Sequence, residues 1–115
     1  MEFRFTEEQQ MIRDTAEAFL AEVSTAAAVR EVMATERGYD AALWQQISEE
    51  MMWPALHIPE AYGGLGLGFV ELAAMQEQMG RVLLCAPFLA TVGLGVNALL
   101  VAGTETQKQQ YLAAI

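Results

Sequence analysis

The sequence is poor in the residues from which small proteins build disulfides, metal sites and nucleic-acid-binding surfaces. It has one cysteine, Cys85, and one histidine, His57, among 115 residues. A single cysteine excludes an internal disulfide, and a lone histidine without further ligands at suitable spacing argues against a metal site. The chain has six basic but fifteen acidic side chains, a net charge of −9. Repulsion from phosphates therefore disfavours sequence-independent binding to nucleic acid.

The sequence also lacks the marks of export and of membrane insertion. Its first residues have neither the basic nor the apolar stretch of a signal peptide, so we expect a cytoplasmic protein. Residues 82–102 form an uncharged run of 21 residues, long enough to span a bilayer. However, Pro87 is expected to start a helix inside this run, and no basic cluster flanks it. We therefore expect a buried helix there and no membrane association.

Apolar residues recur at helical spacing nearly throughout, and no strand-like alternation is present. We expect an all-α fold, an irregular bundle of about five or six helices. The only long irregular stretch, residues 54–68, is rich in glycine and proline and is expected to link helices three and four. The helices are expected over about residues 6–23, 24–36, 40–53, 69–82, 87–102 and from 104 onward.

Capping signals support these helix starts. Thr6 with Gln9, and Thr104 with Gln107, have the spacing of a capping box. In this motif the threonine hydroxyl accepts the backbone N–H of the glutamine, and the glutamine side chain accepts the backbone N–H of the threonine. Asp40 is a suitable N-cap for the third helix. On the fourth helix, a buried face is expected to comprise Leu72, Ala73, Met75 and Met79.

Three features resemble catalytic or nucleotide-binding elements but are expected to be structural. The glycines from Gly63 to Gly68 do not have dinucleotide-binding or P-loop spacing, so we expect a tight turn between two helices. His57 is expected to be a loop residue hydrogen-bonded to backbone. Cys85 has no partner histidine or close cation, which favours a packed side chain over a nucleophile. We thus expect no catalytic residue, no cofactor-binding residue and no metal ligand in this chain.

Four stretches, taken together, resemble the N-terminal domain of the acyl-CoA dehydrogenases. They are Phe5-Thr6-Glu7-Glu8-Gln9, Trp53-Pro54 with Ile58-Pro59-Glu60-Ala61-Tyr62-Gly63-Gly64-Leu65-Gly66, Gln78-Met79-Gly80-Arg81, and Ala102-Gly103-Thr104-Glu105-Thr106-Gln107-Lys108 with Tyr111-Leu112. Their order and spacing match along the whole chain. The Pro-Glu-x-Tyr-Gly-Gly loop and the Gly-Thr-Glu-x-Gln-Lys turn are the most specific of them.

The resemblance implies an enzyme of three domains, of which residues 1–115 are expected to be the first. Members of the family hold FAD between the middle β domain, the C-terminal helical domain and a neighbouring subunit. They oxidise an acyl-CoA thioester to the 2,3-enoyl-CoA, with a glutamate from the C-terminal part as base. An electron-transfer flavoprotein then reoxidises the flavin. This chain is expected to be an inactive fragment of such a homo- or hetero-oligomer, without the β domain, flavin-binding residues and catalytic glutamate.

Within that family the first domain supplies one wall of the acyl pocket, and the resemblance places this wall on the fifth helix. The residues expected to contact substrate are Ala86, Pro87, Ala90, Thr91 and Leu94. Because Ala90 and Gly93 are small, a wide or branched acyl group would have room. Ordinary helix packing explains the same residues equally well, so both interpretations stay open.

Other functions remain compatible with the sequence. One is a related oxidase, monooxygenase or catalytically silent partner subunit of the same fold, which differs in residues outside this chain. Another is a non-enzymatic, acidic helical interaction module, suggested by an apolar content of 54% and by the missing site.

Overall fold

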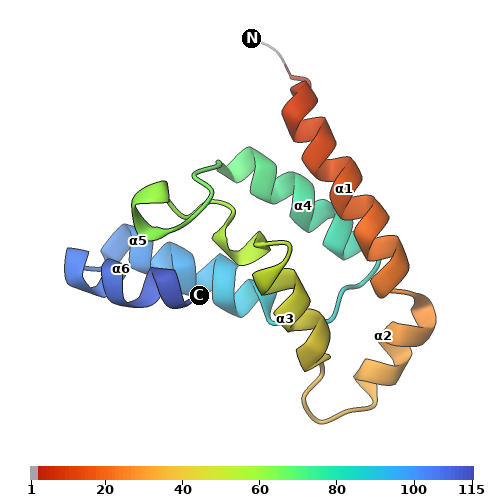
Figure 1. Cartoon of the computed structure of the whole chain (residues 1–115). Helices are drawn as coiled ribbons and strands as arrows, with labels where there is room; N and C mark the ends of the chain where they lie inside the picture. Colours follow the sequence, from red (N-terminus) through yellow and green to blue (C-terminus); the bar gives the residue numbers. More distant parts are fainter. Residues whose placement is uncertain (1–2) are drawn as a thin grey trace. The chain divides into compact units, whose positions relative to one another are not determined.

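The computed structural model describes residues 3–115, whose regular elements are all helical and which contain no strand. The α-helices are α1 (Glu7–Val23), α2 (Ala26–Met33), α3 (Ala41–Glu49), α4 (Phe69–Arg81), α5 (Asn97–Ala102) and α6 (Glu105–Tyr111) (Figure 1). The shorter or irregular elements are the 3-10 turns η1 (Trp53–Ala55), η2 (Glu60–Tyr62) and η4 (Leu112–Ala114), and the π-helix η3 (Leu89–Val96). The expected all-α fold class is confirmed.

The chain forms two compact units that alternate along the sequence. Unit 1 comprises the residues up to Tyr39 together with Phe69–Cys85, and therefore holds α1, α2 and α4. Unit 2 comprises Asp40–Gly68 and Ala86–Ile115, and holds the remaining elements. No described helix is both long and apolar enough to cross a membrane.

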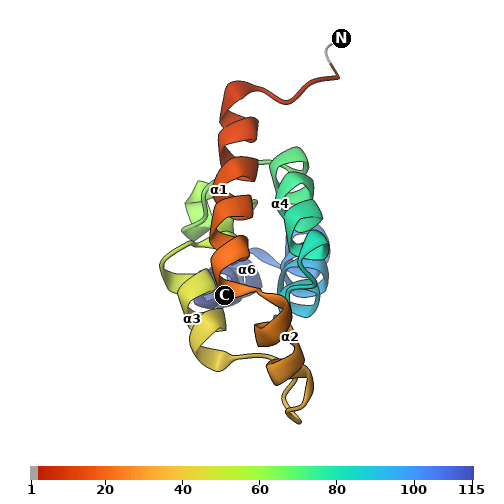
Figure 2. The same ribbon diagram turned by 90° about the vertical axis from the view of Figure 1, so that its right-hand side faces the viewer.

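Unit 1 is organised around α1 and α4, which lie side by side in both views (Figures 1 and 2). The expected capping box starts α1: the Gln9 N–H donates to Thr6 Oγ1 at 3.2 Å, and the Thr6 N–H donates to Gln9 Oε1 at 3.0 Å. On its inner side α1 buries Ala16 and Leu20, the latter completely. The amphipathic pattern of this helix thus predicts its packing correctly.

The buried face of α4 lacks the expected Ala73 and includes Ala74 and Gln78, which were not expected. Leu72, Met75 and Met79 are buried as expected, but Ala73 is exposed and Ala74 is buried in its place. Ala73 precedes Met75 by two residues, which corresponds to about 200° around the axis, because each helical residue turns about 100°. It therefore points away from the face that Met75 occupies, and its assignment was wrong.

Helix α2 is shorter than expected because a side chain competes for its last carbonyls. It ends at Met33, where the sequence predicts continuation to about residue 36. Thr35 Oγ1 donates to the Val32 carbonyl at 2.7 Å and accepts the Gly38 N–H at 3.1 Å. A hydroxyl that bonds to nearby backbone in this way closes a turn and stops the helix.

Unit 2 begins with α3, whose N-cap is Asp40 as expected. The Asp40 carboxylate accepts the N–H groups of Ala42 and Leu43 at 2.9 and 3.4 Å. The helix ends at Glu49, earlier than Pro54 alone predicts. Met52 has a φ of 56°, in the left-handed region, so the chain has already left the helix before the proline.

The stretch expected to be irregular, residues 54–68, is an ordered set of turns that packs into unit 2. Its 3-10 turns η1 and η2 precede the glycines, and Ile58 is buried in one cluster with Val96 and Leu112. A Cβ at Gly64 would lie 2.0 Å from the Ile58 carbonyl oxygen. Only glycine allows this approach, so the expected tight turn is confirmed with a steric reason.

Candidate functional site

Three of the five predicted contact residues, Ala90, Thr91 and Leu94, lie on a continuous helix of unit 2 that runs from Phe88 through η3 and α5, and Ala86 and Pro87 directly precede it. The carbonyl of Pro87 accepts the Thr91 N–H at 3.1 Å, so the proline stands immediately before the first helical residue. The helix closes at Gly103, whose N–H donates to the Leu99 carbonyl at 2.9 Å. Both ends agree with the sequence prediction to within one residue.

The interior of this helix is a π-helix, which the sequence analysis did not predict. In a π-helix each N–H bonds five residues back, so each turn is wider than in an α-helix. Phe88, Val92 and Val96 form the buried side of the segment. Leu89 and Leu94, five residues apart, lie on its outer side with 68% and 64% of their surfaces exposed, so the expectation of a helix buried on all sides was wrong. Such segments are rare and often occur at functional sites.

The five predicted contact residues fall into two groups. Ala90 and Leu94 are exposed, whereas Ala86, Pro87 and Thr91 are half-buried. The exposed pair lies beside Leu89, which the α-helical spacing did not select. We call Leu89, Ala90 and Leu94 the outer strip.

Gly93 makes room for Leu89, which is not among the five predicted contact residues. A Cβ at Gly93 would lie 2.8 Å from Leu89 Cδ1, closer than side chains tolerate. The absence of a side chain at Gly93 thus lets Leu89 lie along the helix surface. The pair of glycines in an apolar helix was the only signal in the sequence that pointed to this arrangement.

A chain of polar contacts ties the outer strip's helix to the loop of residues 54–68. His57 is buried, with 7% of its surface exposed, and its Nε2 lies 2.9 Å from Asn97 Oδ1. The Asn97 amide in turn donates from Nδ2 to the Gly93 carbonyl at 3.1 Å. His57 therefore has a side-chain partner in Asn97 that the sequence did not predict, and its expected bond to backbone stays a prediction. We call these three residues the polar tether.

A second tether starts from the same loop and reaches a different helix. The Tyr62 hydroxyl donates to Glu105 Oε2, in the first turn of α6, at 2.7 Å. This hydrogen bond raises the pKa of Tyr62 above its ordinary value, because losing the proton would leave two negative charges in contact. The Thr104–Gln107 capping box, confirmed at 3.2 and 2.9 Å, starts the same helix.

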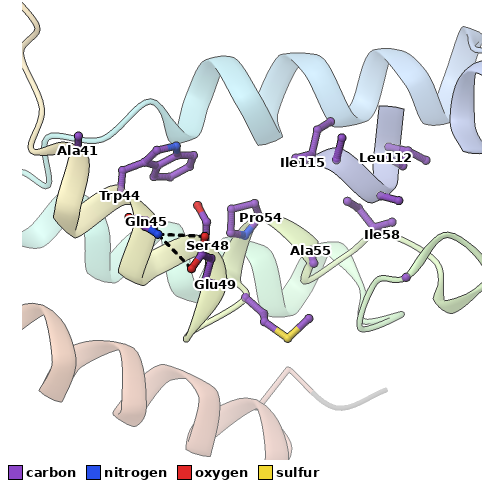
Figure 3. A pocket seen from close by; sticks show the side chains of 14 residues that line it. Ala41, Trp44, Gln45, Ser48, Glu49, Pro54, Ala55, Ile58, Leu112 and Ile115 are labelled. Atoms are coloured by element: carbon purple, nitrogen blue, oxygen red, sulfur yellow. Dashed lines mark hydrogen bonds between the residues drawn. The ribbon is translucent and has the colours of Figure 1, made fainter. Parts of the chain in front are cut away.

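Unit 2 also contains a hollow of about 520 Å³, shown in Figure 3. Its apolar lining includes Trp44, Pro54, Ala55, Ile58, Leu112 and Ile115. On its polar edge, the Gln45 amide donates to both carboxylate oxygens of Glu49 at 3.2 Å. None of the five predicted contact residues lines this hollow, and no acid–base or nucleophile–base pair stands in it.

The other residues considered as possible catalytic groups make structural contacts. Cys85 is half-buried and its Sγ contacts the Leu83 carbonyl at 3.6 Å, while Arg81 pairs with Glu17 at 3.3 Å. This agrees with a packed thiol. Within residues 3–115, no three histidine, cysteine or acidic side chains gather where they could hold a metal ion.

The glycine-rich loop uses its backbone donors internally. The N–H groups of Gly63, Gly64 and Gly66 donate to carbonyls of the same loop at 3.0, 3.2 and 2.9 Å. A loop that cradles phosphates must aim free N–H groups at the ligand. This loop therefore does not fit a dinucleotide phosphate.

Comparison with known proteins gives a consistent result over nearly the whole chain. The family model described as "Acyl-CoA dehydrogenase, N-terminal domain" matches residues 6–115. Acyl-CoA dehydrogenase IpdE2 of Mycobacterium tuberculosis is 37% identical over 107 residues, which are 93% of this chain and 34% of that protein. Mitochondrial isovaleryl-CoA dehydrogenase of Bos taurus is 32% identical over 92% of this chain and 25% of its own length. The chain thus spans about a third of the length of the curated relatives named IpdE2.

Two solved structures share the fold. The ChsE4–ChsE5 complex of Mycobacterium tuberculosis matches with a TM-score of 0.86 and 27% identity, over 99% of this chain and 31% of that one. A variant described as a Tcur3481–Tcur3483 steroid ACAD matches with a TM-score of 0.84 and 26% identity, over 95% of this chain and 29% of that one. Each match covers nearly the whole chain.

Proposed function

Because this chain belongs to the acyl-CoA dehydrogenase family, as its N-terminal domain, we propose that it lines the acyl pocket of a flavin-dependent acyl-CoA dehydrogenase. The whole protein would oxidise an acyl-CoA thioester to the 2,3-enoyl-CoA. Relatives named acyl-CoA dehydrogenases support this activity. Since the chain spans about a third of their length, the activity is proposed for the protein that contains this domain.

The observation that carries the proposal is the outer strip. Leu89 and Leu94 expose about two thirds of their surfaces on a helix that has no charged residue. Isolated apolar residues at a surface are ordinary, but a contiguous apolar strip calls for an apolar partner. An acyl chain is such a partner. We therefore assign substrate contact to Leu89 together with Ala86, Pro87, Ala90, Thr91 and Leu94.

We propose that the cofactor of the family is held outside this chain. FAD would serve as the hydride acceptor when bound, since the redox chemistry belongs to the flavin. The two phosphates of FAD need hydrogen-bond donors, and the N–H groups of Gly63, Gly64 and Gly66 already donate to carbonyls of their own loop. We therefore place the flavin-binding residues and the base in other domains of the protein, and assign this domain to substrate positioning alone.

The size of the acyl group is proposed from the small residues of the helix. Ala90 and Gly93 leave room beside the outer strip, which favours a wide or branched group over a thin chain. The related structure described as a steroid ACAD supports a wide, polycyclic substrate. Oxidation by the protein should then be faster with such thioesters than with straight-chain ones.

Assembly with further subunits is part of the proposal. One related structure is a complex of two different proteins, and the other is named for two. We propose that the protein works as an oligomer, with an electron-transfer flavoprotein as electron acceptor and a cytoplasmic location. A catalytically silent subunit that lends its fold to an active partner is the second candidate, supported by the same complexes.

The test is made on the full protein that contains this domain, purified with any partner subunit. We expect flavin absorbance that is bleached when a wide acyl-CoA is added without electron acceptor. Bleaching only in the presence of a partner subunit would favour the silent-subunit alternative. A colourless preparation that gains no colour from added FAD, alone or with partners, would contradict both.

A further inference from the structure

We propose that the polar tether, His57–Asn97–Gly93, sets the position of the outer strip and so determines which acyl widths the pocket accepts. The inference rests on the proposed function, because it concerns the same wall. His57 and Asn97 are positioning residues here: their side chains act on the helix backbone, and the outer strip makes the contact with substrate.

The direction of each hydrogen bond follows from the Gly93 end. The Gly93 carbonyl can only accept, so the Asn97 atom facing it at 3.1 Å must be the amide nitrogen. Asn97 Oδ1 then faces His57, and an acceptor at 2.9 Å requires a proton on His57 Nε2. The tether is therefore a directed series of two donors, from imidazole to amide to carbonyl. Reversing the amide would set two acceptors against each other.

The tether meets the helix where its geometry changes. Asn97 is the first residue of α5 and follows the last residue of η3, while Gly93 lies inside η3. An α-helical residue bonds four positions back, whereas a π-helical one bonds five back, so the carbonyls near such a boundary have irregular partners. The Asn97 side chain supplies a donor to the Gly93 carbonyl four residues earlier. This contact stabilises the π-helical turn at the boundary where the chain would otherwise return to α-helical hydrogen bonding.

The wide turn in turn places the outer strip. Leu89 and Leu94 share one side because they are five residues apart in a π-helix, and Leu89 lies over Gly93. If the segment relaxed to α-helical geometry, five residues would turn by about 500°, that is, about 140° past one full turn, and the two leucines would diverge. The pocket wall would then lose its shape although every residue in contact with substrate was unchanged.

The burial of His57 fixes the other end of the tether. With 7% of its surface exposed, His57 lies in a loop whose neighbour Ile58 is packed with Val96 and Leu112. The loop thus holds the imidazole in one place, and the hydrogen bond transfers that position to the helix. A buried polar pair of this kind specifies a geometry more than it adds stability.

The test compares three tether variants with one control in the full, flavin-loaded protein. His57→Phe keeps a ring but removes the Nε2 proton, and Asn97→Asp keeps the acceptor for His57 but removes the donor to Gly93. His57→Gln retains a donor and serves as the rescue. Tyr62→Phe is the matched control, because it removes the other tether of the same loop, which reaches α6.

The readout is the ratio of kcat/KM for a polycyclic acyl-CoA to that for a straight-chain acyl-CoA. We expect His57→Phe and Asn97→Asp to lower this ratio about tenfold or more, the discrimination that a small change in pocket shape produces. His57→Gln should restore most of it, and Tyr62→Phe should leave it unchanged. A ratio that stays constant in the first two variants, or that falls equally in Tyr62→Phe, would overturn the inference.

Amide hydrogen exchange gives a second readout that needs no activity. Exchange across Leu89–Val96 should accelerate in His57→Phe and Asn97→Asp and stay unchanged in Tyr62→Phe. If the wild-type protein oxidises no acyl-CoA, the proposed function fails, and exchange alone decides whether the tether positions this helix. Equal exchange in all variants would then refute the tether. If His57→Phe does not fold, the comparison of Asn97→Asp with Tyr62→Phe tests the same point.

Discussion

Unit 1 and unit 2 are similar in size but differ in how the sequence specifies them. Unit 1 is made of three regular α-helices, and its main packing joins the apolar faces of α1 and α4. Unit 2 contains the described 3-10 turns and the π-helix. Its turns and helices are joined by individual contacts, which involve the missing Cβ of Gly64, the Asn97 amide and the Tyr62 hydroxyl. Periodic apolar residues suffice for the first kind of unit, whereas the second kind depends on individual contacts.

The largest effect is expected from a cavity in unit 1. Leu20 is completely buried in α1, so Leu20→Ala should lower the free energy of unfolding by about 2–5 kcal/mol. Urea denaturation followed by circular dichroism measures this. The control is Met11→Ala on the exposed side of the same helix, which should cost much less. Equal losses from the two variants would show that α1 is not held by its apolar face.

A slightly smaller effect is expected from one added methyl group in unit 2. Gly64→Ala forces a Cβ onto the Ile58 carbonyl, and overpacking of this kind costs about 1–3 kcal/mol. The change should be measured by the same urea denaturation. Gly80→Ala in α4 is the control, since a Cβ there meets nothing within 4 Å. If Gly64→Ala were as mild as Gly80→Ala, the loop would be pliable and the contrast between the units would fail.

The two capping boxes allow the units to be compared through identical chemistry. Thr6→Ala and Thr104→Ala each remove a hydroxyl that accepts an N–H at 3.2 Å, so each should cost about 1 kcal/mol. Thr→Ser at either position keeps the acceptor and should be nearly neutral. A loss at Thr6 without one at Thr104 would mean that α6 contributes little to the stability of unit 2.

The smallest effect is expected from pH. The bond to Glu105 raises the pKa of Tyr62, so its stabilising contribution is complete below the ordinary tyrosine pKa and is lost as pH rises through the raised one. The stability difference between wild type and Tyr62→Phe should therefore shrink between neutral and strongly alkaline pH. Thermal melting across that range measures it. A difference that grows with pH would contradict the hydrogen bond's direction.

Much of the fold follows from patterns in the sequence. The capping residues Thr6, Asp40 and Thr104 are all confirmed, because capping depends on a few adjacent atoms. Helix ends set by side chains were less predictable. The Thr35 hydroxyl ends α2 early, and the left-handed Met52 ends α3 early; neither residue type carries a strong stop signal.

The helix proposed as the acyl wall lies where the sequence predicts it, but its geometry was not predicted. It exposes Ala90 and Leu94 where a buried helix was expected, and Leu89 was not selected because the spacing assumed an α-helix. The contact between His57 and Asn97 joins residues 40 positions apart. Periodicity carries no information about a pair so distant, which is why this side-chain partner of His57 was not predicted.

The alternation of the two units along the chain affects how the domain can be synthesised and exchanged. The chain passes from unit 1 to unit 2, back to unit 1 and again to unit 2, at Tyr39–Asp40, Gly68–Phe69 and Cys85–Ala86. During translation α1 must therefore wait for α4, roughly 60 residues later, with its apolar face uncovered. For the same reason neither unit can be transplanted into a relative as one continuous segment: recombination within this family has to carry both units together or cut the chain at all three boundaries.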